Sequence, residues 1–138
     1  MQVLFEGLYK QFTGSTGVGS TGESSLSVIL GGRLHPIEAP QGSTYPYGVY
    51  HLISDVPEYT FNETIENAII QFNLFDDDNS AKDINTAFTA LTDLYDWKTI
   101  PFSTGYTSIY MQRELSYLLK ESGVWNYMIQ YRLVFQKN

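Results

Sequence analysis

Two histidines come first, because a histidine can act as a general acid or base or bind a metal. His35 precedes Pro36 in a proline-rich stretch, and His51 lies in a predicted strand. A catalytic or metal-binding histidine needs a partner held close to it, and neither residue belongs to a metal-binding pair spaced for one helix face. Both histidines are therefore interpreted as structural or surface residues.

The acidic run that begins at Asp76 has the carboxylates of a calcium-binding loop. Asp76, Asp78 and Ser80 could fill its first, third and fifth ligand positions. The sixth position requires Gly and holds Ala81, and the twelfth requires a bidentate Glu and holds Ala87. The motif fails, so we interpret the run as an acidic helix start, where the helix dipole favours negative charge. A weak, incidental contact with a divalent cation remains open.

The other chemical motifs are weaker. Residues 17–22 match GxGxxG, but phosphate binding needs a preceding strand and a following helix, so a flexible loop at about 14–22 is expected. Glu63 and Glu66 are interpreted as solvated residues beside a strand. The chain contains no Cys, which excludes disulfides, thiolate nucleophiles and Cys-based zinc sites. The sequence therefore predicts no catalytic site, no cofactor and no metal.

Charge and composition limit the partners. Fifteen acidic residues against eight basic ones give a net charge of −7, and the basic residues are scattered from Lys10 to Lys137. Binding of a nucleic-acid phosphate backbone needs clustered Lys and Arg, so this distribution argues against it. Aromatic residues make up 15% of the chain and charged residues 17%. This composition is more typical of a component of a protein assembly than of a freely diffusing enzyme. No stretch is long enough to span a membrane, and the N-terminus does not resemble a signal peptide. We expect a soluble protein of a reducing compartment.

The length of 138 residues suits one domain over residues 1–138, and hydrophobic periodicity predicts its elements. The elements expected are helices at 2–12 and 80–96 and strands at 47–53, 65–75, 106–119 and 124–136. A further short helical segment is expected at 24–30, ended by glycine. The order α-β-β-α-β-β predicts an α+β fold, in which helices pack on one face of a four-stranded antiparallel sheet.

The apolar faces of these elements predict the core. The last strand gives the clearest alternation, and in the strand before it Met111 and Leu115 are expected on one face. The core residues expected are Leu4, Leu8, Ile84, Phe88, Leu91, Trp125, Tyr127, Ile129, Tyr131 and Leu133.

The region 26–53 carries a resemblance to a known family. Its pattern is Leu26-x-x-Ile29-Leu30-Gly31-Gly32-Arg33-Leu34-His35-Pro36, then Ala39-Pro40-Gln41-Gly42, then Tyr45-Pro46-Tyr47-Gly48-Val49-Tyr50. This arrangement resembles the tail terminator proteins of long-tailed bacteriophages, also called tail completion or tail-to-head joining proteins. The residues that match the family pattern are Gly31, Gly32, Arg33, Pro36, Pro40, Gly42, Tyr45, Pro46 and Tyr47, and they are interpreted as fold-defining.

The resemblance implies a structural role without turnover. Such proteins form a six-membered ring on the head-proximal end of the tail tube, stop its polymerisation and present the surface that meets the head connector. The implied partners are further copies of the chain, the tail tube protein and the connector or stopper protein. DNA would pass through the lumen without specific binding, and no membrane is involved. The implied location is the virion tail, after assembly in the host cytoplasm.

Two other classes stay open at this point. One is a different phage neck or head-completion protein. The other is a small cytosolic ligand-binding or enzymatic α+β domain, since a fold alone does not fix a function.

Overall fold

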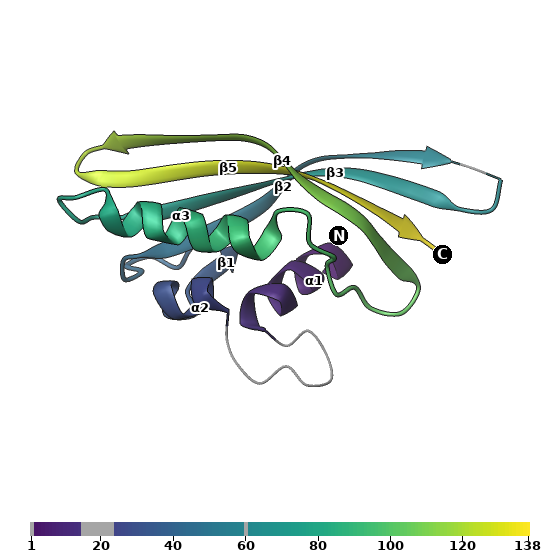
Figure 1. Ribbon diagram of the computed structural model, residues 1–138, viewed down its shortest axis with the longest axis horizontal. Helices are drawn as coiled ribbons and strands as arrows, with labels where there is room; N and C mark the ends of the chain where they lie inside the picture. Colours follow the sequence, from purple (N-terminus) through teal and green to yellow (C-terminus); the bar gives the residue numbers. More distant parts are fainter. Residues whose placement is uncertain (1, 15–23, 60) are drawn as a thin grey trace.

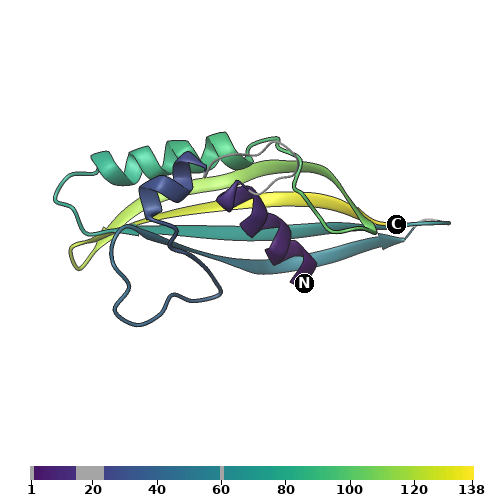
Figure 2. The ribbon, with the colours of Figure 1, turned by 90° about the horizontal axis from the view of Figure 1, so that it is seen from below.

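In the described part of the chain, one twisted sheet carries three helices. They lie on the same side of the sheet, as Figure 1 shows and Figure 2 shows from the helix side. The structure is a computed structural model that describes residues 2–14, 24–59 and 61–138. The flexible loop expected at 14–22 lies outside the described residues, apart from Gly14. Within the described ranges, no helix is long and apolar enough to cross a membrane.

The sheet has five strands in the order β1-β2-β3-β5-β4. The strands are β1 (Leu34–Pro36), β2 (Tyr47–Tyr59), β3 (Thr64–Asp76), β4 (Tyr106–Glu121) and β5 (Val124–Lys137). β1 runs parallel to β2, and the other neighbours are antiparallel. The prediction of a four-stranded antiparallel sheet is therefore wrong, because the sheet has a fifth strand and is mixed.

The missing strand is β1, and its length explains why it was not predicted. Three residues cannot show an alternating pattern, and the prolines around them favour an irregular connection. β1 is held by its pairing with β2, where Leu34 lies opposite Gly48. A Cβ on Gly48 would lie 2.8 Å from Leu34 Cδ1, so this close approach depends on a residue without a side chain.

The helices are α1 (Gln2–Thr13), α2 (Ser25–Leu30) and α3 (Lys82–Tyr95). The order α-β-β-α-β-β omits α2 and is wrong in this respect as well. α2 has only six residues and depends on its caps: Ser24 accepts a hydrogen bond from the Ser27 amide at 3.1 Å, and Gly31 ends the helix with a φ of 59°. At the start of α3, Ser80 Oγ accepts a hydrogen bond from the Lys82 amide.

The core lies between the helices and the sheet face that they cover. Seven of the expected core residues are at most 1% exposed, namely Leu4, Leu8, Ile84, Leu91, Ile129, Tyr131 and Leu133. Phe88, Trp125 and Tyr127 are partly buried and pack against this cluster. Tyr95 is fully buried and donates a hydrogen bond to the Leu8 carbonyl at 2.8 Å, which ties α1 to α3.

The expected alternation along β4 fails because the strand is irregular. Its register with β5 shifts across Glu114, which adds one residue and reverses the faces beyond it. Met111 pairs with Leu133 on the covered face, whereas Leu115 pairs with Gln130 on the open face. The prediction that Met111 and Leu115 share a face is wrong, because a bulge leaves no trace in hydrophobic periodicity.

Candidate assembly surface

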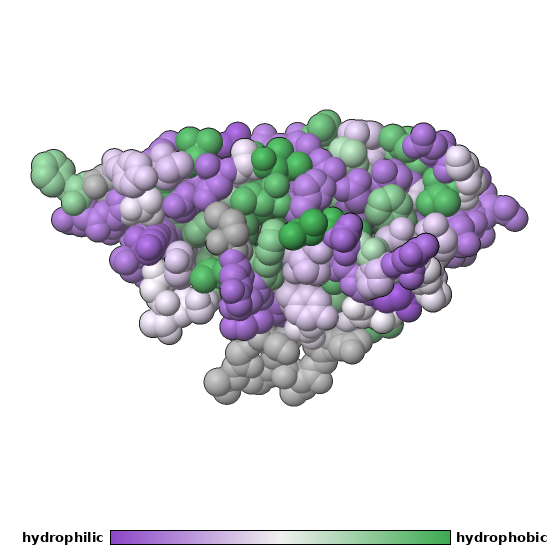
Figure 3. Space-filling view, turned by 180° about the vertical axis from the view of Figure 1, so that it is seen from behind, coloured by the Kyte–Doolittle hydropathy of each residue, from purple (hydrophilic) through white to green (hydrophobic). Residues whose placement is uncertain are grey.

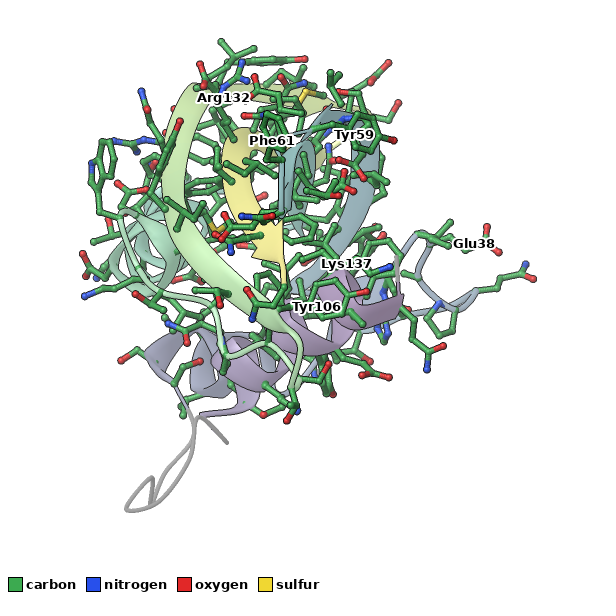
Figure 4. All side chains as sticks on the ribbon, turned by 90° about the vertical axis from the view of Figure 1, so that its right-hand side faces the viewer. Glu38, Tyr59, Phe61, Tyr106, Arg132 and Lys137 are labelled. Carbon is green, nitrogen blue, oxygen red and sulfur yellow. The ribbon has the colours of Figure 1, made fainter. Side chains whose placement is uncertain are left out.

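The two most exposed large apolar side chains of the described residues lie where β2 turns into β3. We call residues 53–59 and 61–66 the hairpin arm; it extends beyond the helices at the right of Figure 1. Tyr59 is 80% exposed and Phe61 is fully exposed, and Ile53 and Val56 are also exposed. Figure 4 looks onto this end of the molecule and shows Tyr59 and Phe61 on the arm. Aromatic side chains displayed in this way are typical of protein–protein contacts.

The arm is long because β2 and β3 continue their pairing beyond the helix layer. Asp55 lies opposite Ala68 and Pro57 lies opposite Glu66. At these two positions β2 carries a carboxylate and a proline, whereas a strand position in the core would carry an apolar side chain. None of the described residues of the arm is fully buried, so its aromatic tip is available to another chain.

A carboxyl pair lies at the base of the arm. Asp55 and Glu66 share a hydrogen bond that requires one proton, and this bond, with partial burial, raises the pKa of Glu66 to about 7. The positive charge of Lys137 lowers the pKa of Glu66 and so partly opposes this rise. Asp55 Oδ1 is buried and has no hydrogen-bond partner among the described residues. The sequence suggested Glu63 and Glu66 as the notable pair, and only the strand register brings Asp55 to Glu66.

A hollow of about 630 Å³ opens between residues 37–46 and the sheet face that carries no helix. Its floor is formed by Tyr47 and His51 of β2 and by Asn73 of β3. The loop over this hollow projects from the sheet, as Figure 2 shows, and carries Glu38 outward, as Figure 4 shows. The hollow is shallow and open, which suits a segment of another chain better than an enclosed small molecule.

The residues that match the family pattern lie around this loop. Arg33 Nε donates to the Pro46 carbonyl at 3.2 Å and thereby joins the two ends of the loop. The ring of Tyr47 lies between those of Tyr45 and Phe75, with centroids 5.3 Å and 5.1 Å away. Gly31, Gly32 and Gly42 all have positive φ values, and Pro36 and Pro40 lie at the start of the loop region. These residues shape the loop and form no charged or nucleophilic cluster.

The open face of the sheet is polar and hydrogen-bonded. Side-chain amides form a ladder in which Gln130 donates to Gln71, Gln71 to Asn73, and Asn73 to Asn126, over 2.9 to 3.2 Å. At the β4 bulge, Arg132 pairs with Glu114 at 2.8 Å. Figure 3 shows the molecule from behind the view of Figure 1, where hydrophobic and hydrophilic side chains are mixed and a small hydrophobic group lies near the centre.

The acidic run at the end of β3 brings three carboxylates together. Asp76, Asp78 and Asp83 each place one carboxylate oxygen within 4.8 Å of the others. Burial raises the pKa of Asp76, and a hydrogen bond with Asp78 raises that of Asp83, which Lys82 partly opposes. Asp83 was not among the ligands tested by the calcium-loop motif. Ser80, which was, accepts a hydrogen bond from the Lys82 amide and is not part of the cluster.

The two histidines lie apart from this cluster. His35 lies in β1 and lines a groove between that strand and α1, and His51 lines the hollow beneath residues 37–46. Among the described residues, Asp76, Asp78 and Asp83 form the one group of three His, Cys, Asp or Glu side chains arranged to hold a metal ion.

The comparisons with known proteins find a similar fold but no similar sequence. No protein-family model matches the chain, and no curated protein matches it. The fold is similar to that of a chain in a solved structure described as "Virion of native gene transfer agent (GTA) particle", with a TM-score of 0.73 and 11% identity. The match covers 98% of this chain and 96% of that chain. At this identity the likeness shows a shared fold.

Proposed function

We propose that this chain is a structural protein of a phage-like virion. The observation that carries the proposal is the likeness to a chain of the gene transfer agent virion, which extends over 98% of this chain and 96% of that one. A fold can serve several functions, so the proposal also needs support from the surface. The exposed aromatic tip of the hairpin arm and the low content of charge provide it.

Within the virion, the proposed role is that of a tail terminator. The resemblance of region 26–53 to that family supports this finer assignment, and the matching residues include Arg33 and Pro46, which are joined by a hydrogen bond. Copies of the chain would form a ring of six on the head-proximal end of the tail tube. The ring would stop tube polymerisation and provide the joint to the head connector.

A ring needs two different contact surfaces on each copy, because its interfaces are head-to-tail. The hairpin arm supplies one candidate at one end of the molecule. The long edge strand β4, with Ile109, Leu115 and Tyr117 exposed, and the hollow beneath residues 37–46 are candidates for the other. The proposed role involves no catalytic step and no cofactor.

A second candidate is another neck or head-completion protein. The similar structure is that of a whole virion, and its description names no position for the matching chain, so the same fold match supports this candidate. The two candidate roles differ in which part of the virion this chain would join to its neighbour.

Electron microscopy of particles assembled without this protein separates the two roles. Overlong or head-free tails are expected for a terminator, whereas empty or leaking heads on normal tails would indicate a head-completion role. Normal particles would contradict both, and a purified monomer that binds a small molecule in the hollow would favour a ligand-binding domain.

The contribution of the arm is tested by complementation with the double variant Tyr59→Ser/Phe61→Ser. Both side chains are exposed, so the fold should keep its melting temperature while particle assembly is lost. Val28→Ser is the matched control, because Val28 is 65% exposed on α2, away from the arm. Normal assembly by the double variant would show that the arm is not a contact surface.

A further inference from the structure

We propose that Asp76, Asp78 and Asp83 form a binding site for a divalent cation, with Ca²⁺ as the preferred ion. The three ligands come from three elements: the last residue of β3, the following loop and the first turn of α3. All three lie within residues 76–83, but their spacing is not that of a calcium-binding loop, whose 12 residues supply ligands from positions 1, 3, 5, 7, 9 and 12. This inference does not depend on the proposed function.

The distances fit a shared ion. One carboxylate oxygen from each residue lies within 4.8 Å of the others, which is about twice a Ca²⁺–oxygen bond of ~2.4 Å. A single Ca²⁺ can therefore bind all three oxygens without a rearrangement of the backbone. Mg²⁺ has bonds of about 2.0–2.1 Å, so the carboxylates would have to move closer together around it.

The burial of Asp76 provides a second observation that points to a ligand. This residue is only 4% exposed. Its Oδ1 accepts a hydrogen bond from the Asp77 amide at 3.0 Å, but its Oδ2 is buried without any hydrogen-bond partner in the described part of the chain. An unpaired buried carboxylate oxygen is costly, and a bound cation would satisfy it.

The surrounding residues suit a hard cation. All three side chains offer carboxylate oxygens, which Ca²⁺ prefers over the nitrogen and sulfur ligands of zinc sites. Asp78 and Asp83 are exposed, so water can reach the ion and complete its coordination. Trp125 Nε1 donates to the Asp78 carbonyl at 2.9 Å, which fixes the loop against β5.

The position of Trp125 allows a direct binding measurement. Tb³⁺ replaces Ca²⁺ in oxygen sites, and its luminescence is sensitised by an indole a few ångströms away. We expect Tb³⁺ luminescence on excitation of tryptophan, and its loss on addition of Ca²⁺. Trp125→Phe should abolish the signal, whereas Trp97→Phe should keep it.

Thermal melting tests the three ligands. An open carboxylate site is expected to bind Ca²⁺ with a Kd of ~10⁻⁴–10⁻³ M, so Ca²⁺ at about 10 mM should raise the melting temperature by roughly 5–10 °C. Asp76→Asn and Asp83→Asn should lose this rise. Asp76→Asn should also melt above the wild type in chelator, because it removes the unpaired buried charge.

Asp77→Asn is the matched control, because it removes one negative charge from the same loop and leaves the three ligands intact. It should retain the full Ca²⁺ response. A wild-type shift below about 1 °C, or an equal loss of the shift in Asp77→Asn, would overturn the proposal, the latter because it would indicate a diffuse attraction of cations.

Discussion

Asp55 and Glu66 illustrate how a single pair of residues can make the fold sensitive to pH. Their carboxyls lie on neighbouring strands at the base of the hairpin arm and share one proton through a hydrogen bond. The shared proton is bound more tightly in the folded state than in the unfolded one, because the unfolded chain separates the two groups.

The pH dependence follows from the direction of the shift. The pKa of Glu66 is raised from 4.5 to about 7, so the folded state holds a proton that the unfolded state releases between these values. This contribution to stability is fully present below pH 4.5 and is lost as the pH rises through about 7. We therefore expect the free energy of unfolding to fall over this range in denaturant titrations at a series of pH values.

The variant Glu66→Gln should remove this part of the pH dependence, because the amide keeps a donor and carries no charge. Glu58→Gln is the control, since Glu58 is an exposed acid on the same arm. If the pH profiles of the two variants coincide, the raised pKa of Glu66 has no part in stability.

At the residue scale, the sequence predicts side-chain types but not their neighbours. Most of the expected core residues could be identified because alternation and helical periodicity mark them locally. The contact of Asp55 with Glu66 depends on the register of a hairpin that also contains a bulge after Leu52. The grouping of Asp83 with Asp76 depends on how α3 leaves the sheet, and spacing in the sequence does not encode this.

At the scale of elements, β5 is the central contributor to the core. It lies between β3 and β4, and its covered face includes Ile129, Tyr131 and Leu133, all fully buried. The ring of Tyr127 stacks on that of Phe88 of α3, with centroids 4.1 Å apart. A side chain removed from this strand leaves a space that neither the sheet nor the helix layer can easily fill.

Ile129→Ala should lower the free energy of unfolding by about 2–5 kcal/mol, as expected for a fully buried side chain that leaves a cavity. Ile109→Ala removes the same atoms from a side chain that is 45% exposed on β4, so its effect should be clearly smaller. Equilibrium unfolding in urea measures both. Equal losses would contradict the assignment of faces along β5.

The shortest elements depend on contacts made elsewhere in the chain. β1 has three residues, is held by its pairing with β2 and was not predicted. The six-residue helix α2 lies within the helical segment expected at 24–30, and Ser24 and Gly31 cap it. Periodicity needs several residues to become visible, so such elements are determined by tertiary contacts. The long elements α3, β3 and β5 show their pattern over 13 or 14 residues and could be predicted.

At the scale of the whole molecule, the helices cover one face of the sheet and leave the other open. The open face carries an amide ladder and the Arg132–Glu114 pair. The hairpin arm and the acidic cluster lie at opposite ends of β3. This arrangement leaves separate surfaces at the two ends of the strand, as the proposed ring would require.

The charge of the whole molecule leads to a prediction about DNA. Each copy carries a net charge of −7, and a ring of such copies would surround the DNA that passes through the tail. An acidic or neutral bore repels phosphates and lets DNA move, whereas a basic bore would hold it through contacts that weaken with salt. Segments 58–66 and 76–83 are acid-rich candidates for the lining, and basic side chains would face protein partners.

The purified protein should therefore show no measurable binding of duplex DNA at physiological salt, where the screening length is about 8 Å. Fluorescence anisotropy with a labelled duplex measures this, and a second titration at low salt tests whether screening hides an attraction. Adding Ca²⁺ provides a further control, because an ion at Asp76, Asp78 and Asp83 would reduce the negative charge there without creating a basic surface. Tight duplex binding that weakens steeply with added salt would contradict the proposed terminator ring, since DNA must leave the tail without being retained.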